Sequence, residues 1–214
     1  MTPIPAHNSV INYTDNLTKD TIRKVATLAG QFSFDSYVDE LAETCTQGTG
    51  EKDLVGEISA AFYCVQNRVE WHRDPITGEK IYQPPLLARR VLKFVNGYVA
   101  YPPKGDCDDK ACLLMCLLLN RGHAARAVGA WQSLIPPYQG CPDPQNPKWK
   151  RINHVYIEVK DPGRQRIVDG GTVQRTGGWL PLEPSSESLP PFKQNPAVIP
   201  IVNFYATVDE KVIR

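Results

Sequence analysis

The sequence is organised around residues 105–120, which read GDCDDKACLLMCLLLN. Most of this stretch is apolar on every side, and a helix of that kind is normally buried. Its polar start is typical of a helix N-terminus: we expect Asp106 to cap the helix and Asp109 to reach back toward the cap. Gly122 suits the position just past the C-terminus. These features predict a helix over residues 107–120.

Helical and strand-like patterns are segregated along the chain. Apolar residues at helical spacing predict helices over residues 16–29, 34–45, 52–67 and 84–98. Strand-like runs come later, over residues 124–131, 154–160, 164–169 and 198–208. Helices first and strands later predict an α+β fold. Within a single domain we distinguish a helical lead (1–50), a core (51–180) and a Pro-rich extended segment (181–214).

Composition excludes several classes of protein. The 214 residues include 24 Lys and Arg against 23 Asp and Glu, a balance that argues against nucleic-acid binding. The longest apolar run is far shorter than the roughly 20 residues that span a bilayer. The first residues lack the basic and apolar regions of a secretory signal, so we expect a cytoplasmic protein. In that compartment the six cysteines are expected to be reduced thiols.

Cys107 is the candidate nucleophile. It falls in the first turn of the predicted helix, where free N–H groups and the helix dipole stabilise a thiolate. A lone cysteine at a helix start is more often a small buried residue, but Cys107 is flanked by polar residues. Its acidic neighbours raise the thiol pKa, so a cationic partner is required. Cys112 and Cys116 lie four residues apart on an apolar helix, and we interpret both as core residues.

His154 is the candidate base, because it opens a predicted strand on the strand's polar face. Asp161-Pro162-Gly163-Arg164 has the pattern of a type II turn. A hairpin closed by that turn places Asp169 opposite Tyr156, one diagonal step from His154. A slip of one residue would reverse this arrangement. Cys107, His154 and Asp169 then form a nucleophile, a base and an orienting acid.

This order of residues resembles the transglutaminase-like cysteine-protease superfamily, in its short microbial and phage members. The resemblance rests on GDCDD at 105–109, on NRGHAARAV at 120–128, and on His154-Val155-Tyr156, which is similar to the family's His-Val-Trp. It implies a papain-like core, with the nucleophile's helix packed on an antiparallel sheet. The family's aspartate is often followed by Pro and Thr, whereas Asp169 is followed by two glycines.

The resulting hypothesis is a thiol-dependent hydrolase or acyltransferase that acts on an amide or isopeptide bond of a protein or peptide. Hydrolysis is favoured over transamidation, because a small open site admits water. Tyr101 is a candidate oxyanion donor, and Trp149, in the Pro-rich insertion over 132–153, is a candidate wall for substrate.

The alternative is a non-catalytic phage structural or assembly protein that retains the fold. Its partners would be virion or assembly proteins, and it would reside in the host cytoplasm or the virion. We expect no cofactor and no metal in either case, because the Cys and His spacings lack the paired short loops of zinc sites.

Overall fold

Five helices account for most of the first 120 residues. The computed structural model describes residues 9–11, 17–50, 53–72, 79–132, 154–161, 178–186, 189–193 and 198–207. The helices are α1 (Leu17–Phe32), α2 (Ser36–Thr46), α3 (Leu54–Arg68), α4 (Pro84–Val95) and α5 (Cys107–Asn120). Their bounds lie within a few residues of the helices that the apolar spacing predicts. Gly122 has a φ of +81° just past α5, as expected for a residue that ends a helix.

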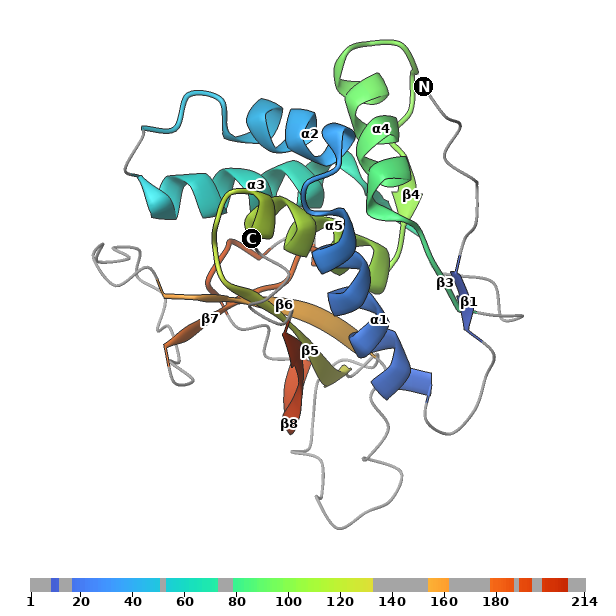
Figure 1. The fold of residues 1–214 in the computed structure, drawn as a ribbon, viewed down its shortest axis with the longest axis vertical. Helices are drawn as coiled ribbons and strands as arrows, with labels where there is room; N and C mark the ends of the chain where they lie inside the picture. Colours follow the sequence, from blue (N-terminus) through green and yellow to red (C-terminus); the bar gives the residue numbers. More distant parts are fainter. Residues whose placement is uncertain are drawn as a thin grey trace.

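The second half of the chain builds an antiparallel sheet with strand order β7-β6-β5-β8. Its strands are β5 (Ala125–Gln132), β6 (His154–Lys160), β7 (Trp179–Leu182) and β8 (Val198–Thr207). Two small pairs accompany it, namely β1 (Ser9–Ile11) with β3 (Glu79–Ile81) and β2 (Glu70–Trp71) with β4 (Lys104–Gly105). The predicted α+β class is therefore confirmed (Figure 1).

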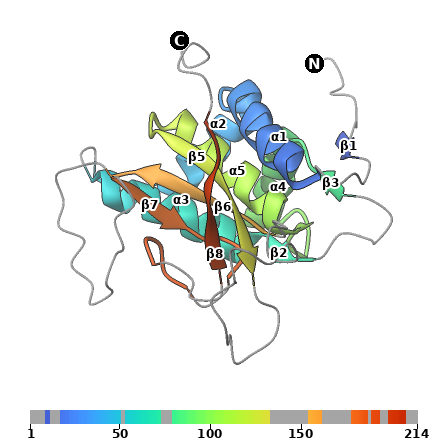
Figure 2. The same cartoon turned by 90° about the horizontal axis from the view of Figure 1, so that it is seen from below.

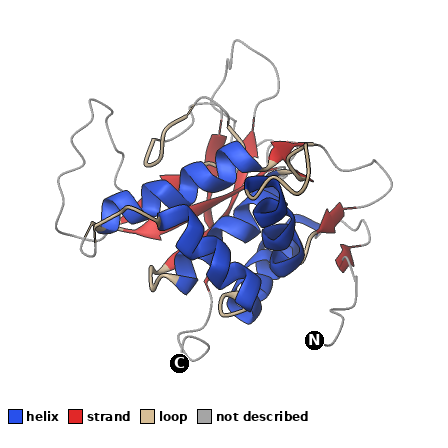
Figure 3. Ribbon diagram, turned by 90° about the horizontal axis from the view of Figure 1, so that it is seen from above, coloured by secondary structure: helices blue, strands red, loops and turns tan. Residues whose placement is uncertain are grey.

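The helices and the sheet form two layers, with α5 at the centre. The helices cover one face of the sheet, which Figures 2 and 3 show from opposite sides. Helix α5 contacts each of the other four helices as well as β5 and β6. Every residue of α5 from Asp108 to Leu119 is buried. The central position of α5 explains why its sequence is apolar all round rather than along one stripe.

The pairing of β6 differs from the predicted hairpin. Residues 154–159 of β6 pair with β5 on one edge, and residues 157–160 pair with β7 on the other. Both edges of β6 are thus occupied between Ile157 and Val159, so the predicted pairing with residues 164–169 is wrong. Strand β7 also crosses the boundary that we placed between residues 180 and 181. The described part of the Pro-rich segment contributes β8 to the same sheet.

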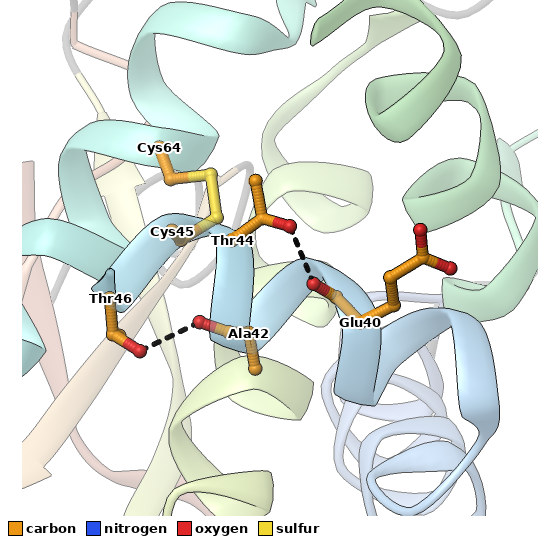
Figure 4. Close-up of a disulfide and its surroundings, with 6 residues drawn as sticks. All are labelled: Glu40, Ala42, Thr44, Cys45, Thr46 and Cys64. Carbon is orange, nitrogen blue, oxygen red and sulfur yellow. Dashed lines mark hydrogen bonds between the residues drawn. A yellow bond between two sulfur atoms is a disulfide. The ribbon is translucent and has the colours of Figure 1, made fainter. Parts of the chain in front are cut away.

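Cys45 and Cys64 form a disulfide, which corrects the expectation that all six cysteines are reduced thiols. Cys45 lies near the end of α2, and Cys64 lies in the neighbouring helix α3 (Figure 4). Their Cα atoms are 5.6 Å apart, within the range that a disulfide spans. Reduced thiols were expected because the cytoplasm is a reducing compartment, and this disulfide is at odds with that expectation. No helix in the described ranges is long and apolar enough to cross a bilayer.

The disulfide yields a prediction about stability. Replacing both residues (Cys45→Ala with Cys64→Ala) should lower the free energy of unfolding by about 3 kcal/mol, because the bond closes a loop of about 20 residues in the unfolded chain. Urea unfolding with and without a reductant measures this. The reductant should destabilise the native protein and leave the double variant unchanged. An unfolding midpoint of the native protein that does not respond to the reductant would contradict the prediction.

Candidate active site

The start of α5 is held by the carboxylate of Asp109. The backbone N–H of Asp106, which precedes the first turn in an extended conformation, donates to Asp109 Oδ2 over 3.4 Å. The N–H of Tyr82 donates to Asp109 Oδ1 over 2.6 Å. A Cβ at position 105 would come within 2.9 Å of the Asp109 Cβ, so the close approach requires Gly105. The predicted reach of Asp109 back to the start of the helix is confirmed.

Cys107 occupies the first position of α5, next to the start of β6. It is half-buried, and the backbone of Val155 hydrogen-bonds its sulfur. Burial and the carboxylates of Asp106 and Asp108 raise the pKa of the Cys107 thiol well above its usual range, and this hydrogen bond only partly offsets them. The expected thiolate is therefore disfavoured: desolvation and the acidic neighbours outweigh the helix dipole at this position.

His154 is buried and faces an acidic partner that we did not predict. Its Nε2 atom hydrogen-bonds Glu183 Oε2, and the two side chains are 3% and 4% exposed. The other carboxylate oxygen, Glu183 Oε1, accepts the N–H of Ser185 over 3.1 Å. Glu183 directly follows β7, and β7 pairs with β6. The pairing of these two strands therefore brings Glu183 next to His154. A buried carboxylate that fixes one ring nitrogen also fixes the orientation of the imidazole.

Three elements thus converge at this site. Cys107 comes from the N-terminus of α5, His154 from the start of β6, and Glu183 from the turn after β7. The backbone of Val155, the residue after His154, hydrogen-bonds the Cys107 sulfur. This contact places the sulfur beside the start of β6. The carboxylate of Glu183 also contributes to the raised pKa of Cys107, which places it near the thiol.

Asp169 and Trp149, which we also predicted for the site, lie outside the described residues. The hairpin that placed Asp169 beside His154 does not form. In the observed register Ile157 pairs with Leu182, and one more step places Glu183 opposite Tyr156. The geometric argument for an acid at that place therefore applies to Glu183. Glu183-Pro184-Ser185 also carries an acid followed by Pro and a small hydroxyl residue, the signal that could have identified it.

The remaining candidates are surface or core residues. Tyr101 is 83% exposed, so its role as an oxyanion donor stays a prediction. Cys112 and Cys116 are fully buried, as expected, and their sulfurs face the carbonyl oxygens of Val25 and Ala29. Oxygens of Asp106, Asp108 and Asp109 lie within 4.8 Å of one another. We assign no metal to these acids, because Asp108 Oδ1 and both carboxylate oxygens of Asp109 already accept backbone N–H groups.

A buried ion pair stabilises the strand that carries His154. Glu158 on β6 is 3% exposed, and its Oε2 lies 2.5 Å from Arg126 Nη2 on β5. Its Oε1 accepts the hydroxyl of Tyr156 over 3.0 Å. Burial and the neighbouring Glu158 raise the pKa of the Tyr156 phenol. The guanidinium of Arg126 also stacks 4.5 Å from the ring centroid of Trp179 on β7. The pair therefore connects β5, β6 and β7.

Comparison of the chain with protein-family models, with curated proteins and with solved structures finds no match.

The raised pKa of Cys107 yields a prediction about reactivity. The rate at which iodoacetamide alkylates Cys107 should rise with pH beyond the range of an ordinary thiol, because burial and two carboxylates disfavour the thiolate. Asp106→Asn removes one of these charges, lowers the thiol pKa and should move the rate profile to lower pH. Mass spectrometry of the peptide that contains Cys107 measures the rate.

Asp20→Asn, at an exposed position of α1, is the matched control and should leave the profile unchanged. Fast labelling that is independent of pH under acidic conditions would contradict this prediction, because it would indicate a stable thiolate–imidazolium pair.

Proposed function

We propose that this protein is a thiol-dependent hydrolase of amide or isopeptide bonds, with Cys107 as nucleophile, His154 as general base and Glu183 as the acid that orients the histidine. The observation that carries the proposal is the buried hydrogen bond between His154 and Glu183, beside a cysteine at a helix N-terminus. Such a pair is costly to bury, and it supplies the base and the orienting group that a weakly acidic thiol needs.

The raised thiol pKa favours a general-base mechanism over a preformed thiolate. His154 Nδ1 takes the thiol proton as the sulfur attacks the carbonyl carbon, and Glu183 stabilises the imidazolium through Nε2. The imidazolium then protonates the leaving amine as the C–N bond breaks, which leaves a thioester. Water attacks the thioester, gives its proton to His154 and releases the acid and the thiol. An amine in place of water would give transamidation.

The backbone N–H of Cys107 is the first candidate donor to the oxyanion. It lies in the first turn of α5, where N–H groups have no acceptor within the helix. The charge that develops on the carbonyl oxygen would therefore meet the positive end of the helix dipole.

The resemblance to the transglutaminase-like cysteine-protease superfamily supports the same proposal. A cysteine-bearing helix that packs on an antiparallel sheet is the coarse arrangement that the resemblance implies, and α5 contacts β5 and β6 in this way. Glu183 takes the place of the family's aspartate and is followed by Pro184 and Ser185, close to the family's Pro and Thr. We propose on these grounds that the core is papain-like and that the substrate is a protein or peptide.

Cysteine variants test the proposal. Cys107→Ala should abolish cleavage of a peptide library, with little change in stability, because a half-buried residue at a helix start loses little packing. Cys112→Ala should retain cleavage but lose about 1 kcal/mol of stability, because it empties a fully buried position. Mass spectrometry of new peptide termini and thermal unfolding measure the two effects. Incorporation of a fluorescent primary amine reports transamidation, which should stay below hydrolysis.

Cleavage that survives in the Cys107→Ala variant would exclude the proposed nucleophile. A native protein that neither cleaves the library nor incorporates the amine would instead favour the non-catalytic structural role.

A second pair of variants identifies the orienting acid. Glu183→Gln should lower kcat by roughly 100-fold, because a neutral amide no longer stabilises the imidazolium that forms during general-base catalysis. KM should change little, since Glu183 contacts the histidine rather than the substrate. Asp169→Asn, the matched variant, should cause the smaller loss. Steady-state kinetics on a cleaved library peptide measure both, and a larger loss for Asp169→Asn would transfer the orienting role to Asp169.

A further inference from the structure

A buried lysine lies one helical turn beyond the candidate nucleophile. Lys110 is 1% exposed, and its Nζ atom donates to the carbonyl oxygen of Pro184 over 3.2 Å and to that of Gln66 over 3.3 Å. Residues three apart on a helix share a face, so Lys110 projects from the same side of α5 as Cys107. Burying an ammonium group is costly. If the position only filled space, an apolar side chain would serve it better.

The carbonyl groups that bind Lys110 belong to the support of the site. Pro184 directly follows Glu183, the proposed partner of His154. This segment is a turn rather than a strand: the N–H of Ser186 donates to the Glu183 carbonyl oxygen over 3.3 Å, and the N–H of Ser185 donates to the Glu183 carboxylate. Beyond β7 there is thus no sheet ladder to hold Glu183 in place.

A second buried side chain holds the same turn from helix α3. Gln66 is 6% exposed, and its Nε2 atom donates to the carbonyl oxygens of Ser186 over 2.5 Å and of Leu189 over 2.9 Å. Because Lys110 also binds the Gln66 carbonyl oxygen, the two residues form one connected clamp. The clamp donates hydrogen bonds to the carbonyl oxygens of Pro184, Ser186 and Leu189.

We propose that Lys110, together with Gln66, is a positioning residue that holds Glu183 against His154. Cys107 and Lys110 are on one rigid helix, so the clamp fixes the distance between the nucleophile's helix and the turn that carries the acid. Positioning of this kind matters because a displacement of about 1 Å at a catalytic group can cost roughly 100-fold in rate. The inference rests on the proposed function, but the contact between His154 and Glu183 can be measured without any catalysis.

The test follows the His154 ring by NMR in protein labelled with ¹⁵N at histidine. The chain has four histidines, and a His154→Asn variant assigns the signal. A ring N–H that donates to a buried carboxylate gives a downfield proton resonance that exchanges slowly. Glu183→Gln should shift or remove this resonance. Lys110→Met and Gln66→Leu should weaken it, because each releases one side of the turn, whereas Lys110→Arg, which keeps a cationic donor, should retain it.

Cys112→Ala is the control for lost stability, since it weakens the same helix without contacting the turn. All variants are compared below their unfolding midpoints. If Lys110→Met does not fold, Gln66→Leu carries the test from the other side of the clamp. The proposal is overturned if the folded clamp variants keep the native resonance, or if Cys112→Ala loses it to the same extent.

Kinetics provide the second readout. Relative to Cys112→Ala, Lys110→Met should lower kcat by about 100-fold with little change in KM, because the clamp acts on the base and not on the substrate. In a Glu183→Gln background the same substitution should have a much smaller effect, since both changes act through one contact. Additive losses would show that Lys110 acts independently of Glu183. A protein without any activity would refute the proposed function, while the resonance would still decide the role of the clamp.

Discussion

The burial of α5 from Asp108 to Leu119 is the constraint on which the rest of the structure depends. A helix surrounded by four other helices and a sheet has no solvent-facing side on which polar residues can be placed. Its residues are accordingly apolar from Ala111 to Leu119, and polar chemistry is confined to its first turn. That turn emerges beside the start of β6, where the backbone of Val155 binds the Cys107 sulfur. The position of the candidate nucleophile is thus a consequence of how the core is packed.

The same burial determines the electrostatics of the site. Asp106, Asp108, Lys110, His154 and Glu183 are all less than 10% exposed. Charged groups in such surroundings are weakly screened, so they interact more strongly than they would at the surface. Burial, together with the carboxylates at the start of α5, raises the pKa of the Cys107 thiol well above its usual range. A protonated thiol needs a base that is held in position, and this need links the acidic helix start to the pair of His154 and Glu183.

The sequence predicts those parts of the fold that depend on local patterns. The five helices and the strands over β5, β6 and β8 follow from periodicity, and the cap of α5 follows from its first turn. Strand β7 was missed, because a turn signal at residues 161–164 suggested that the next strand begins earlier. Glu183 was not predicted beside His154 for the same reason: the argument about strand faces was applied to a pairing with residues 164–169, whereas β6 pairs with β7. The disulfide depends on the packing of α2 against α3, which no local pattern encodes.

The last step of the site's construction comes from a segment that is neither helix nor strand. Cys107 begins helix α5 and His154 begins strand β6. The regular backbone hydrogen bonds of these elements fix the positions of both residues. Glu183 lies just beyond its ladder, where a chain without further contacts would sample many conformations at a cost of roughly 1–2 kcal/mol per residue to order. The buried side chains of Lys110 on α5 and Gln66 on α3 hydrogen-bond carbonyl oxygens of this turn. These contacts hold the turn in one conformation. The turn after β7 is therefore part of the candidate site. Helices α3 and α5, which hold this turn, connect the hydrophobic core to the proposed chemistry.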